Sequence, residues 1–329
     1  MSSAAPEIDP GATGDPVVGA SALRQELSSK NVGDRVFRWV TGGVAAISVA
    51  LLAAVAIELA LSARPSIDAF GAGFLWGRVW DYAESFGALP FIAGTMLSAG
   101  LALLFAVPVA LGAALFLTEF SPTWVGRWLG FFVELLAAVP SVIFGLWGIF
   151  AVAPWVRETV QPAMEAWLGW LPFVGGPKTG FGLFTGGLIL AIMILPTITS
   201  VSREVLRATP LALREGALAL GATRWETVRR GVLPVARSGL VGAIMLGFGR
   251  ALGETMAVTM VIGNRPEVVE ALFGPSYTLA SAIANEYTEA TSELHRAALA
   301  ELGLVLFGVT LLLNFAARWL VSRVGRLAS

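Results

Sequence analysis

The chain has 329 residues, of which 56% are hydrophobic and only 14% are charged, and its formal net charge is −1. An ordinary soluble protein carries about a quarter charged residues, so this composition excludes a soluble globular protein and indicates a polytopic membrane protein. The sequence has no cysteine and a single histidine, which excludes disulfides and thiol nucleophiles, and we expect no metal site.

The first 37 residues are rich in Ser, Ala, Gly and Pro and lack sustained apolar periodicity. This composition predicts a disordered tail over residues 1–37. A retained first membrane helix with its outer loop is then expected over residues 38–88. The apolar run that begins near residue 39 is too long for the core of a secretory signal.

Six apolar segments reach about 20 residues or more, the length needed to cross the hydrocarbon core of a bilayer. Backbone groups in lipid must be satisfied within the chain, so we expect six transmembrane helices and an all-α polytopic membrane fold. The six expected spans are 39–61, 89–117, 128–153, 183–202, 238–262 and 297–320.

The distribution of Lys and Arg predicts the orientation of these spans. With a cytoplasmic N-terminus, fifteen of the 22 basic residues fall on the inner side and six on the outer side, while Arg250 lies within a span. Cytoplasmic loops carry such an excess of Lys and Arg. Both termini are therefore expected in the cytoplasm, with a short C-terminal tail over residues 321–329.

Three prolines, Pro108, Pro140 and Pro196, lie inside or at the ends of expected spans. Proline removes a backbone hydrogen bond and kinks a helix. The alternatives are a kink that serves packing and a broken helix that lines a path.

A polar, arginine-bearing segment from Glu215 to Pro234 interrupts the apolar pattern on the expected inner side. Thr209 and Pro210 predict the N-cap and the first residue of a short helix. Gly221 predicts a left-handed turn that ends this helix. Thr223 and Glu226 then match the capping box of a second helix, which Pro234 is expected to close. Capped amphipathic helices outside the membrane dock into lipid or into a partner groove; a solvated basic loop is the alternative.

The same segment resembles the coupling loop of ABC importer permeases, here placed within residues 203–237. The pattern is Glu-Ala-Ala, a glycine four residues later, and Leu-Pro at the end. Gly216 and Gly231 depart from it, standing where Ala and Ile are usual. The resemblance implies docking into an ATP-binding subunit. The residues that match or occupy the pattern are Glu215, Gly216, Ala217, Gly221, Leu233 and Pro234.

Four further stretches resemble phosphate ABC transporter permeases of the PstC type. This resemblance implies a type I ABC importer (MetI-like) permease fold, with the transmembrane domain over residues 89–320, in a bacterial plasma (inner) membrane. The matching stretches are Gly94-Thr95, Glu134–Ser141 with Gly145–Gly148, Met193–Ser200, and Arg250–Val258 with Ile262–Asn264.

The resemblance also implies the partners of the chain. They are a second related permease of the PstA type, a dimer of ATP-binding subunits, an external phosphate-binding protein and the lipid bilayer; no nucleic acid is expected. ATP would be used by the partner, and this chain would bind no cofactor.

Arg250 and Glu254 are expected four residues apart on one face of the fifth span. Ionisable residues at the bilayer centre cost about 2.5–3.5 kcal/mol on insertion scales and face a cavity or each other. The alternatives are a self-neutralising pair that locks packing and a translocation path in which Arg250 meets phosphate, with Glu254 holding it and Thr255 beside it.

Other polar residues give weaker signals. Glu134 and Asn264 are expected to take part in helix packing or in the path. His295 is expected to be exposed, and the outer loop with Glu286 is expected to be solvated or to meet a binding protein.

No nucleotide site or catalytic residue set is expected in this chain. The segment Gly175–Gly180 lacks the Gly before Lys178 that a phosphate-binding loop requires, and no catalytic motif occurs. The sequence thus predicts a transport subunit rather than an enzyme. The alternatives are an importer of sulfate, molybdate or phosphonate, an ion-coupled secondary transporter and a membrane-embedded enzyme.

Overall fold

A computed structural model describes residues 16–81 and 85–326, and within them the chain is predominantly helical. The chain divides into two compact units, one ending at Glu58 and one beginning at Leu59. Six helices in the described part of the chain are long and apolar enough to cross a membrane, as the sequence predicts. They are Gly33–Ser62, Leu89–Phe120, Ser141–Leu168, Leu183–Arg207, Arg224–Leu252 and Glu293–Arg323.

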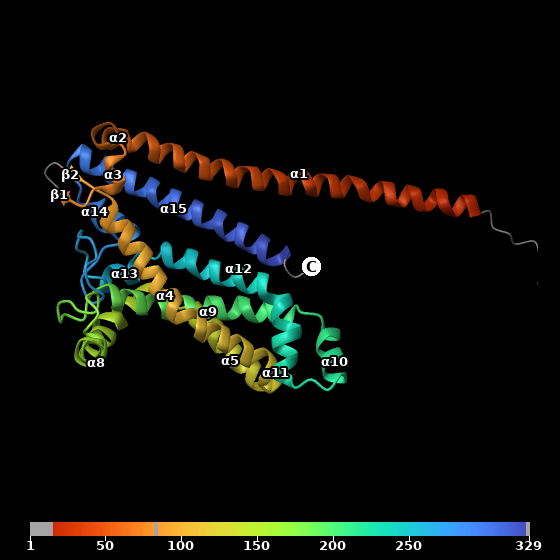
Figure 1. Cartoon of the computed structure of the whole chain (residues 1–329). Helices are drawn as coiled ribbons and strands as arrows, with labels where there is room; N and C mark the ends of the chain where they lie inside the picture. Colours follow the sequence, from red (N-terminus) through yellow and green to blue (C-terminus); the bar gives the residue numbers. More distant parts are fainter. Residues whose placement is uncertain (1–15, 82–84, 327–329) are drawn as a thin grey trace, which may run out of the picture. The chain divides into compact units, whose positions relative to one another are not determined.

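In the described residues, the first unit consists of the greater part of a single long helix, α1 (Pro16–Ser62). The expected disorder over residues 1–37 is therefore wrong for residues 16–37, which are helical (Figure 1); residues 1–15 lie outside the described residues. The segment after Pro16 contains Ala, Leu, Gln, Glu and Lys, which favour helix, and extending a helix costs less than nucleating one. The helix that contains the first apolar span thus begins already at Pro16.

The second unit begins at the end of α1 and contains all the other elements. Its first part comprises α2 (Arg64–Phe70), α3 (Gly73–Trp76), the antiparallel pair β1 (Trp80–Asp81) and β2 (Ser85–Phe86), α4 (Leu89–Leu115), the π-helical turn η1 (Phe116–Phe120), α5 (Thr123–Ala137), α6 (Ser141–Trp147), η2 (Gly148–Val152), α7 (Ala153–Trp155), η3 (Val156–Val160) and α8 (Gln161–Leu168). Its second part comprises α9 (Leu183–Arg207), α10 (Leu211–Ala219), α11 (Arg224–Thr227), η4 (Val228–Val232), α12 (Leu233–Leu252), α13 (Met256–Val261), α14 (Leu279–Glu286) and α15 (Glu293–Arg326).

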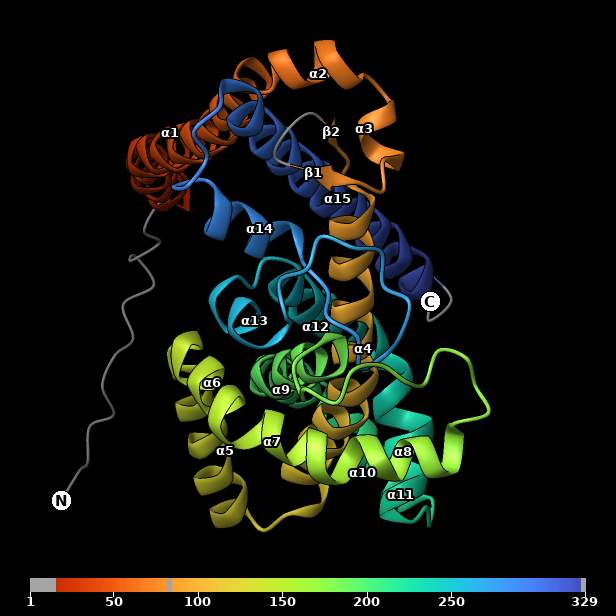
Figure 2. The ribbon, with the colours of Figure 1, turned by 90° about the vertical axis from the view of Figure 1, so that its left-hand side faces the viewer.

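The centre of this unit is the contact of α9 with α4 and α12 (Figure 1, Figure 2). On the side of α4 that packs against α9, every third or fourth residue is a buried alanine. These small side chains let the backbones of α4 and α9 approach closely. Pro108 and Pro196 lie inside α4 and α9, which continue through them. The buried core at this contact includes Ala99, Ala102, Ala106, Ala110, Leu190, Ile194 and Ile198.

Two of the six expected spans are interrupted. The expected span 128–153 contains a break before Pro140, which is the N-cap of α6, because a residue before proline avoids the helical region. The helix long enough to cross begins instead at Ser141. The expected span 238–262 breaks between Leu252 and Met256, where Gly253 caps α12.

The C-terminal tail expected over residues 321–329 is also shortened. The last helix, α15, continues to Arg326, and residues 327–329 lie outside the described residues. Residues 321–326 are therefore an extension of the sixth span rather than a separate tail.

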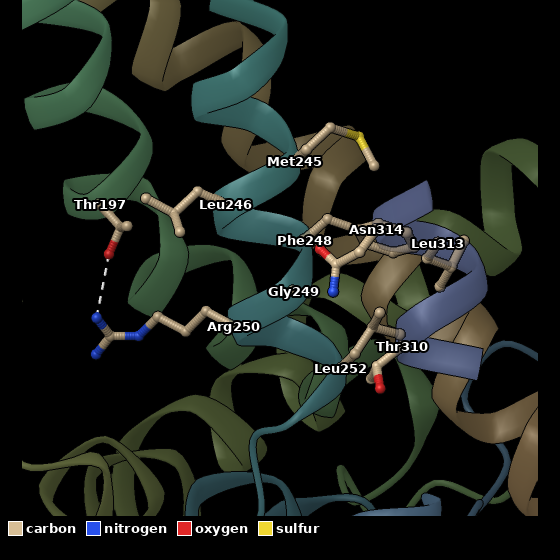
Figure 3. Close-up of a pocket in the computed structure, with 10 residues that line it drawn as sticks. All are labelled: Thr197, Met245, Leu246, Phe248, Gly249, Arg250, Leu252, Thr310, Leu313 and Asn314. Carbon is tan, nitrogen blue, oxygen red and sulfur yellow. Dashed lines mark hydrogen bonds between the residues drawn. The ribbon is translucent and has the colours of Figure 1, made fainter. Parts of the chain in front are cut away.

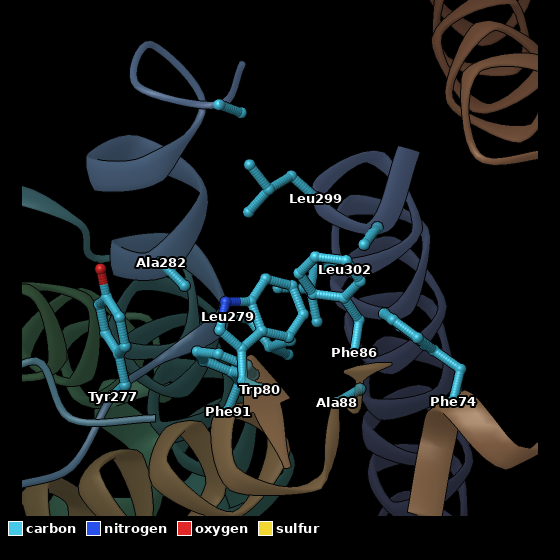
Figure 4. Close-up of a cluster of buried hydrophobic side chains, with 12 residues drawn as sticks. Phe74, Trp80, Phe86, Ala88, Phe91, Tyr277, Leu279, Ala282, Leu299 and Leu302 are labelled. Atoms are coloured by element: carbon cyan, nitrogen blue, oxygen red, sulfur yellow. The ribbon is translucent and has the colours of Figure 1, made fainter. Parts of the chain in front are cut away.

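An aromatic cluster closes the end of the second unit that carries the β-hairpin (Figure 4). Trp80 Nε1 donates to Glu286 Oε2 at 2.9 Å, and His295 Nε2 lies 3.1 Å from the same oxygen. The ring of Phe86 stacks on His295 at 5.3 Å. The expectations of an exposed His295 and a solvated Glu286 are therefore wrong: both residues are buried, because each supplies the other's polar contact.

Candidate functional site

The loop between α9 and α12 presents an apolar helix to the surroundings. α10 carries the predicted Glu215, Gly216 and Ala217, and none of its residues is buried. Leu218 is 49% exposed, and Leu220, just after the helix, is 90% exposed. Among the described residues, the apolar side chains of α10 are therefore left largely uncovered.

The start of α10 differs from the prediction. Thr209 is buried and does not cap the helix; Pro210 occupies the N-cap position in an extended conformation, and no side chain caps the helix. Because Pro210 cannot donate a backbone hydrogen bond, it suits a position just outside the helix. The start of α10 is held instead by the side-chain contacts of Arg214.

Arg214 connects α10 to the ends of two membrane helices. Its Nη2 and Nε donate to Glu119 in η1 at 2.8 and 3.2 Å, which makes a bidentate ion pair. The same guanidinium donates to the carbonyl oxygens of Leu206 at 2.7 Å and Thr209 at 2.6 Å. The Glu119 side chain is 9% exposed, so this network is largely removed from water. It fixes α10 to both α4 and α9.

The turn after α10 has the predicted geometry. Gly221 has φ +82°, the left-handed conformation that favours glycine. The predicted capping box of the second helix is confirmed: Thr223 Oγ1 accepts from the Glu226 backbone N at 3.3 Å, and Glu226 Oε2 accepts from the Thr223 backbone N at 2.9 Å. The two helical segments are therefore joined in a defined conformation.

Leu233 and Pro234 do not end the second helix, in contrast to the prediction. They are the first residues of α12, which continues from α11 through the π-helical turn η4. A wider turn changes the hydrogen-bond pattern where Pro234 has no N–H to donate, so the helix can pass through the proline. The loop is thus continuous with the fifth membrane helix.

A shallow cavity of about 460 Å³ lies on the concave side of this loop. It is bordered by Ala217 from α10, Gly221 from the turn, and Glu226 and Arg230 from the second helix. Apolar and charged groups therefore border the same cavity.

Replacing Gly221 by Val is expected to disturb this loop without affecting the membrane helices. A side-chain carbon at position 221 would meet no atom within 4 Å, so the cost arises from the positive φ alone and is about 1–3 kcal/mol. If the loop docks into an ATP-binding subunit, as the resemblance to ABC importer permeases implies, uptake of the cargo should fall several-fold while ATP hydrolysis persists. The matched control is Gly221→Asn, because asparagine tolerates the left-handed region; equal loss in both variants, or normal coupling in Gly221→Val, would contradict this role.

A second group of polar residues surrounds the break in the fifth span. Arg250 lies in the last turn of α12, is exposed, and donates from Nη1 to Thr197 Oγ1 of α9 at 3.1 Å. Figure 3 shows the two side chains pointing toward each other, with Asn314 of α15 on the other side of α12. All three residues border a cavity of about 480 Å³.

The expected pairing of Arg250 with Glu254 on one helical face is wrong. α12 ends at Leu252, so the four-residue spacing no longer brings the two side chains together, and no ion pair joins them in the described part of the chain. Glu254 Oε1 instead accepts from the backbone N of Ala257 at 3.1 Å. It satisfies a free N–H in the first turn of α13, as an acidic residue does at a helix start.

Thr255 and Asn264 flank α13. Thr255 is its N-cap residue, and its hydroxyl donates to the Gly253 carbonyl at 3.3 Å. Asn264 has φ +50° and donates from Nδ2 to the Thr259 carbonyl at 2.8 Å, which closes the end of the helix. Both residues therefore shape the interrupted backbone. Irregular backbone at membrane depth occurs where it is buried in protein or lines a water-filled cavity.

Glu134 lies elsewhere, on α5. Its side chain is 63% exposed, and its carboxylate is 3.6 Å from Nη1 of Arg203 on α9. The structure therefore places Glu134 in a contact between α5 and α9 rather than beside Arg250.

The fold and the family match define a membrane permease of the ABC importer class. The chain belongs to the binding-protein-dependent transport system inner membrane component family, whose model matches residues 106–326. The same fold occurs in a bacterial ABC transporter that imports alginate, with 19% identity, a TM-score of 0.51, and coverage of 71% of this chain and 79% of that one. It also occurs in the methionine transporter MetNI, with 19% identity, a TM-score of 0.50, and coverage of 71% and 96%.

Curated relatives of the chain include phosphate transport system permease proteins PstC. The protein from Haemophilus influenzae is 46% identical, over 88% of this chain and 94% of the relative. That from Pasteurella multocida is 48% identical, over 88% and 92%. PstC 2 of Mycobacterium tuberculosis is 42% identical, over 92% and 96%.

Three contributors to these sites are not predicted from the sequence. Arg214 counts only toward the positive charge of the loop, Glu119 matches no motif, and the matching stretch Met193–Ser200 contains Thr197 without assigning it a role. Glu119 offers one signal, an acidic residue just beyond an apolar span, but its partner lies 95 positions away. Thr197 lies 53 positions from Arg250, so no local pattern in the sequence links the two side chains.

Proposed function

We propose that this chain is a permease subunit of an ATP-driven importer of inorganic phosphate. The observation that carries the cargo assignment is the similarity to phosphate transport permeases, which extends over 88% or more of the chain at 42–48% identity. The exposed guanidinium of Arg250 agrees with an anionic cargo, because arginine matches phosphate oxygens bidentately.

The mechanism is alternating access driven by a separate ATPase. A dimer of ATP-binding subunits would dock on α10 and the adjoining cavity, with both chain termini and this loop in the cytoplasm. Closure of the dimer would move α10. The Arg214–Glu119 contact would pass this movement to η1 at the end of α4, and the hydrogen bond from Arg214 to the Leu206 carbonyl would pass it to α9. The chain itself would bind no nucleotide.

Transport would occur between this chain and a second, related permease of the PstA type. Arg250 would face the shared path, with Thr197 orienting its guanidinium and the interrupted backbone around Glu254 and Thr255 forming the wall. An external binding protein would deliver phosphate, so the path itself needs only transient binding.

The cargo is tested by uptake into vesicles reconstituted with the full complex and the binding protein. We expect ATP-driven uptake of radiolabelled phosphate, with sulfate, molybdate and phosphonate giving much smaller rates under the same conditions. Sulfate uptake equal to phosphate uptake would contradict the phosphate assignment while leaving the importer class intact.

A further inference from the structure

A polar cavity of about 600 Å³ lies between η1, α5 and α9, apart from the Arg250 site. Among its lining residues are three arginines, Arg127, Arg203 and Arg207, and one carboxylate, Glu134. α9 ends at Arg207 and α10 begins four residues later, so the cavity lies at the end of the unit that bears the coupling loop. The positive charge of the lining exceeds the negative charge.

Arg203 is the buried member of this group. Its side chain is 5% exposed, and Glu134, its ion-pair partner at 3.6 Å, is mostly exposed to solvent. Nη2 reaches only the Gly126 carbonyl, at 3.4 Å, and Nε is buried with no hydrogen-bond partner among the described residues. A buried guanidinium with these long contacts is poorly compensated, and leaving such donors unpaired is costly.

The surface of α5 is shaped to receive this guanidinium. Gly130 lies directly against it, and a side-chain carbon at that position would overlap the Arg203 Nη atoms. Close approach of the charged group to the α5 backbone therefore depends on glycine. The sequence thus brings a positive charge into a narrow space where the protein supplies few acceptors.

The first turn of α5 adds further donors at the same cavity. Thr123 lines it, and α5 begins after Pro122 without a side-chain cap. The Gly126 N–H is bonded to the Pro122 carbonyl at 3.0 Å, so the free N–H groups are those of the residues before Gly126. The free N–H groups of a helix start and the helix dipole both favour a bound anion. The uncapped start of α5 is independent of the unpaired Arg203 Nε. Both features favour a negative charge in the same cavity.

We propose that this cavity binds the phosphate group of an anion. Arg203 would supply the buried donors, Arg127 and Arg207 the exposed charges at the entrance, and the start of α5 its backbone amides. Inorganic phosphate and the headgroup phosphate of an anionic phospholipid share this chemistry. The site is separate from the proposed path and does not depend on which cargo the importer carries.

The test uses the full complex, with Arg250→Gln in every sample so that the path does not contribute to binding. Binding of radiolabelled inorganic phosphate is measured by equilibrium dialysis in nanodiscs of phosphatidylcholine. Retention of phosphatidylglycerol is measured by mass spectrometry after incorporation into nanodiscs that contain it. The variants are Arg203→Gln and the double change Arg127→Gln/Arg207→Gln, with Arg318→Gln as the control at an exposed arginine of α15.

We expect one of the two ligands to bind and its affinity to fall about tenfold or more in both pocket variants, but not in Arg318→Gln. Loss of inorganic phosphate identifies a site for the free anion, and loss of phosphatidylglycerol identifies a lipid site. The double variant changes only exposed side chains, so it remains informative if Arg203→Gln does not fold. Binding of both ligands that is unchanged in the double variant, or equally reduced in the control, would overturn the proposal.

Discussion

Replacing Arg250 by Gln is expected to reduce phosphate uptake by about 10- to 100-fold in reconstituted vesicles. Glutamine keeps part of the side-chain length and one donor group but removes the charge, and a charge-assisted hydrogen bond contributes about 1.5–3 kcal/mol. Because Arg250 is exposed and pairs only with a threonine hydroxyl among the hydrogen bonds in the described part of the chain, its removal leaves no buried carboxylate unpaired. Assembly of the complex should therefore be normal.

Two variants separate a role in the path from a role in packing. Thr197→Val removes the hydroxyl that orients Arg250 while leaving its charge, so we expect a smaller loss of uptake than in Arg250→Gln. Arg318→Gln removes an exposed arginine of α15 and should transport normally. Normal uptake by Arg250→Gln in an assembled complex would remove Arg250 from the path.

Replacing Arg214 by Ala is expected to give the largest structural effect in the coupling loop. The change deletes four hydrogen bonds from one guanidinium and leaves Glu119, 9% exposed, without its partner. Removing one member of a buried ion pair costs about 3–5 kcal/mol. With α10 no longer fixed to the membrane helices, ATP hydrolysis should continue while phosphate uptake falls at least about tenfold.

The size of this effect can be compared with a milder change. Glu119→Gln keeps one oxygen that can accept a hydrogen bond from Arg214, so its thermal destabilisation and loss of uptake should be smaller. Arg318→Ala serves as the control for loss of an exposed arginine. If Arg214→Ala retains both its thermal stability and its ratio of phosphate moved to ATP hydrolysed, this contact does not transmit movement.

The features predicted correctly from the sequence are those whose causes lie within a few residues. The left-handed turn at Gly221 and the capping box of Thr223 with Glu226 are local, because their hydrogen bonds join neighbours along the chain. The six spanning helices also follow from local composition, since a bilayer requires length and apolarity alone.

The features that were missed depend on partners far away or on competition between local signals. Glu286 and Trp80 meet across 206 positions, so the burial of Glu286 and His295 has no local signature. The break after Leu252 lies in an apolar run with no proline, where hydropathy stays high although Gly253 can end a helix. Because of this break, Arg250 and Glu254 do not pair as predicted: Arg250 contacts Thr197, and Glu254 contacts the backbone of Ala257.

We expect ATP hydrolysis by a partner subunit to drive phosphate through this chain. This expectation is tested most directly by measuring phosphate uptake and ATP hydrolysis together in vesicles that contain the full complex and the binding protein. We expect that uptake requires ATP, stops when hydrolysis is blocked, and falls in Arg214→Ala while hydrolysis continues. Sustained phosphate uptake against a gradient in the absence of ATP would contradict it.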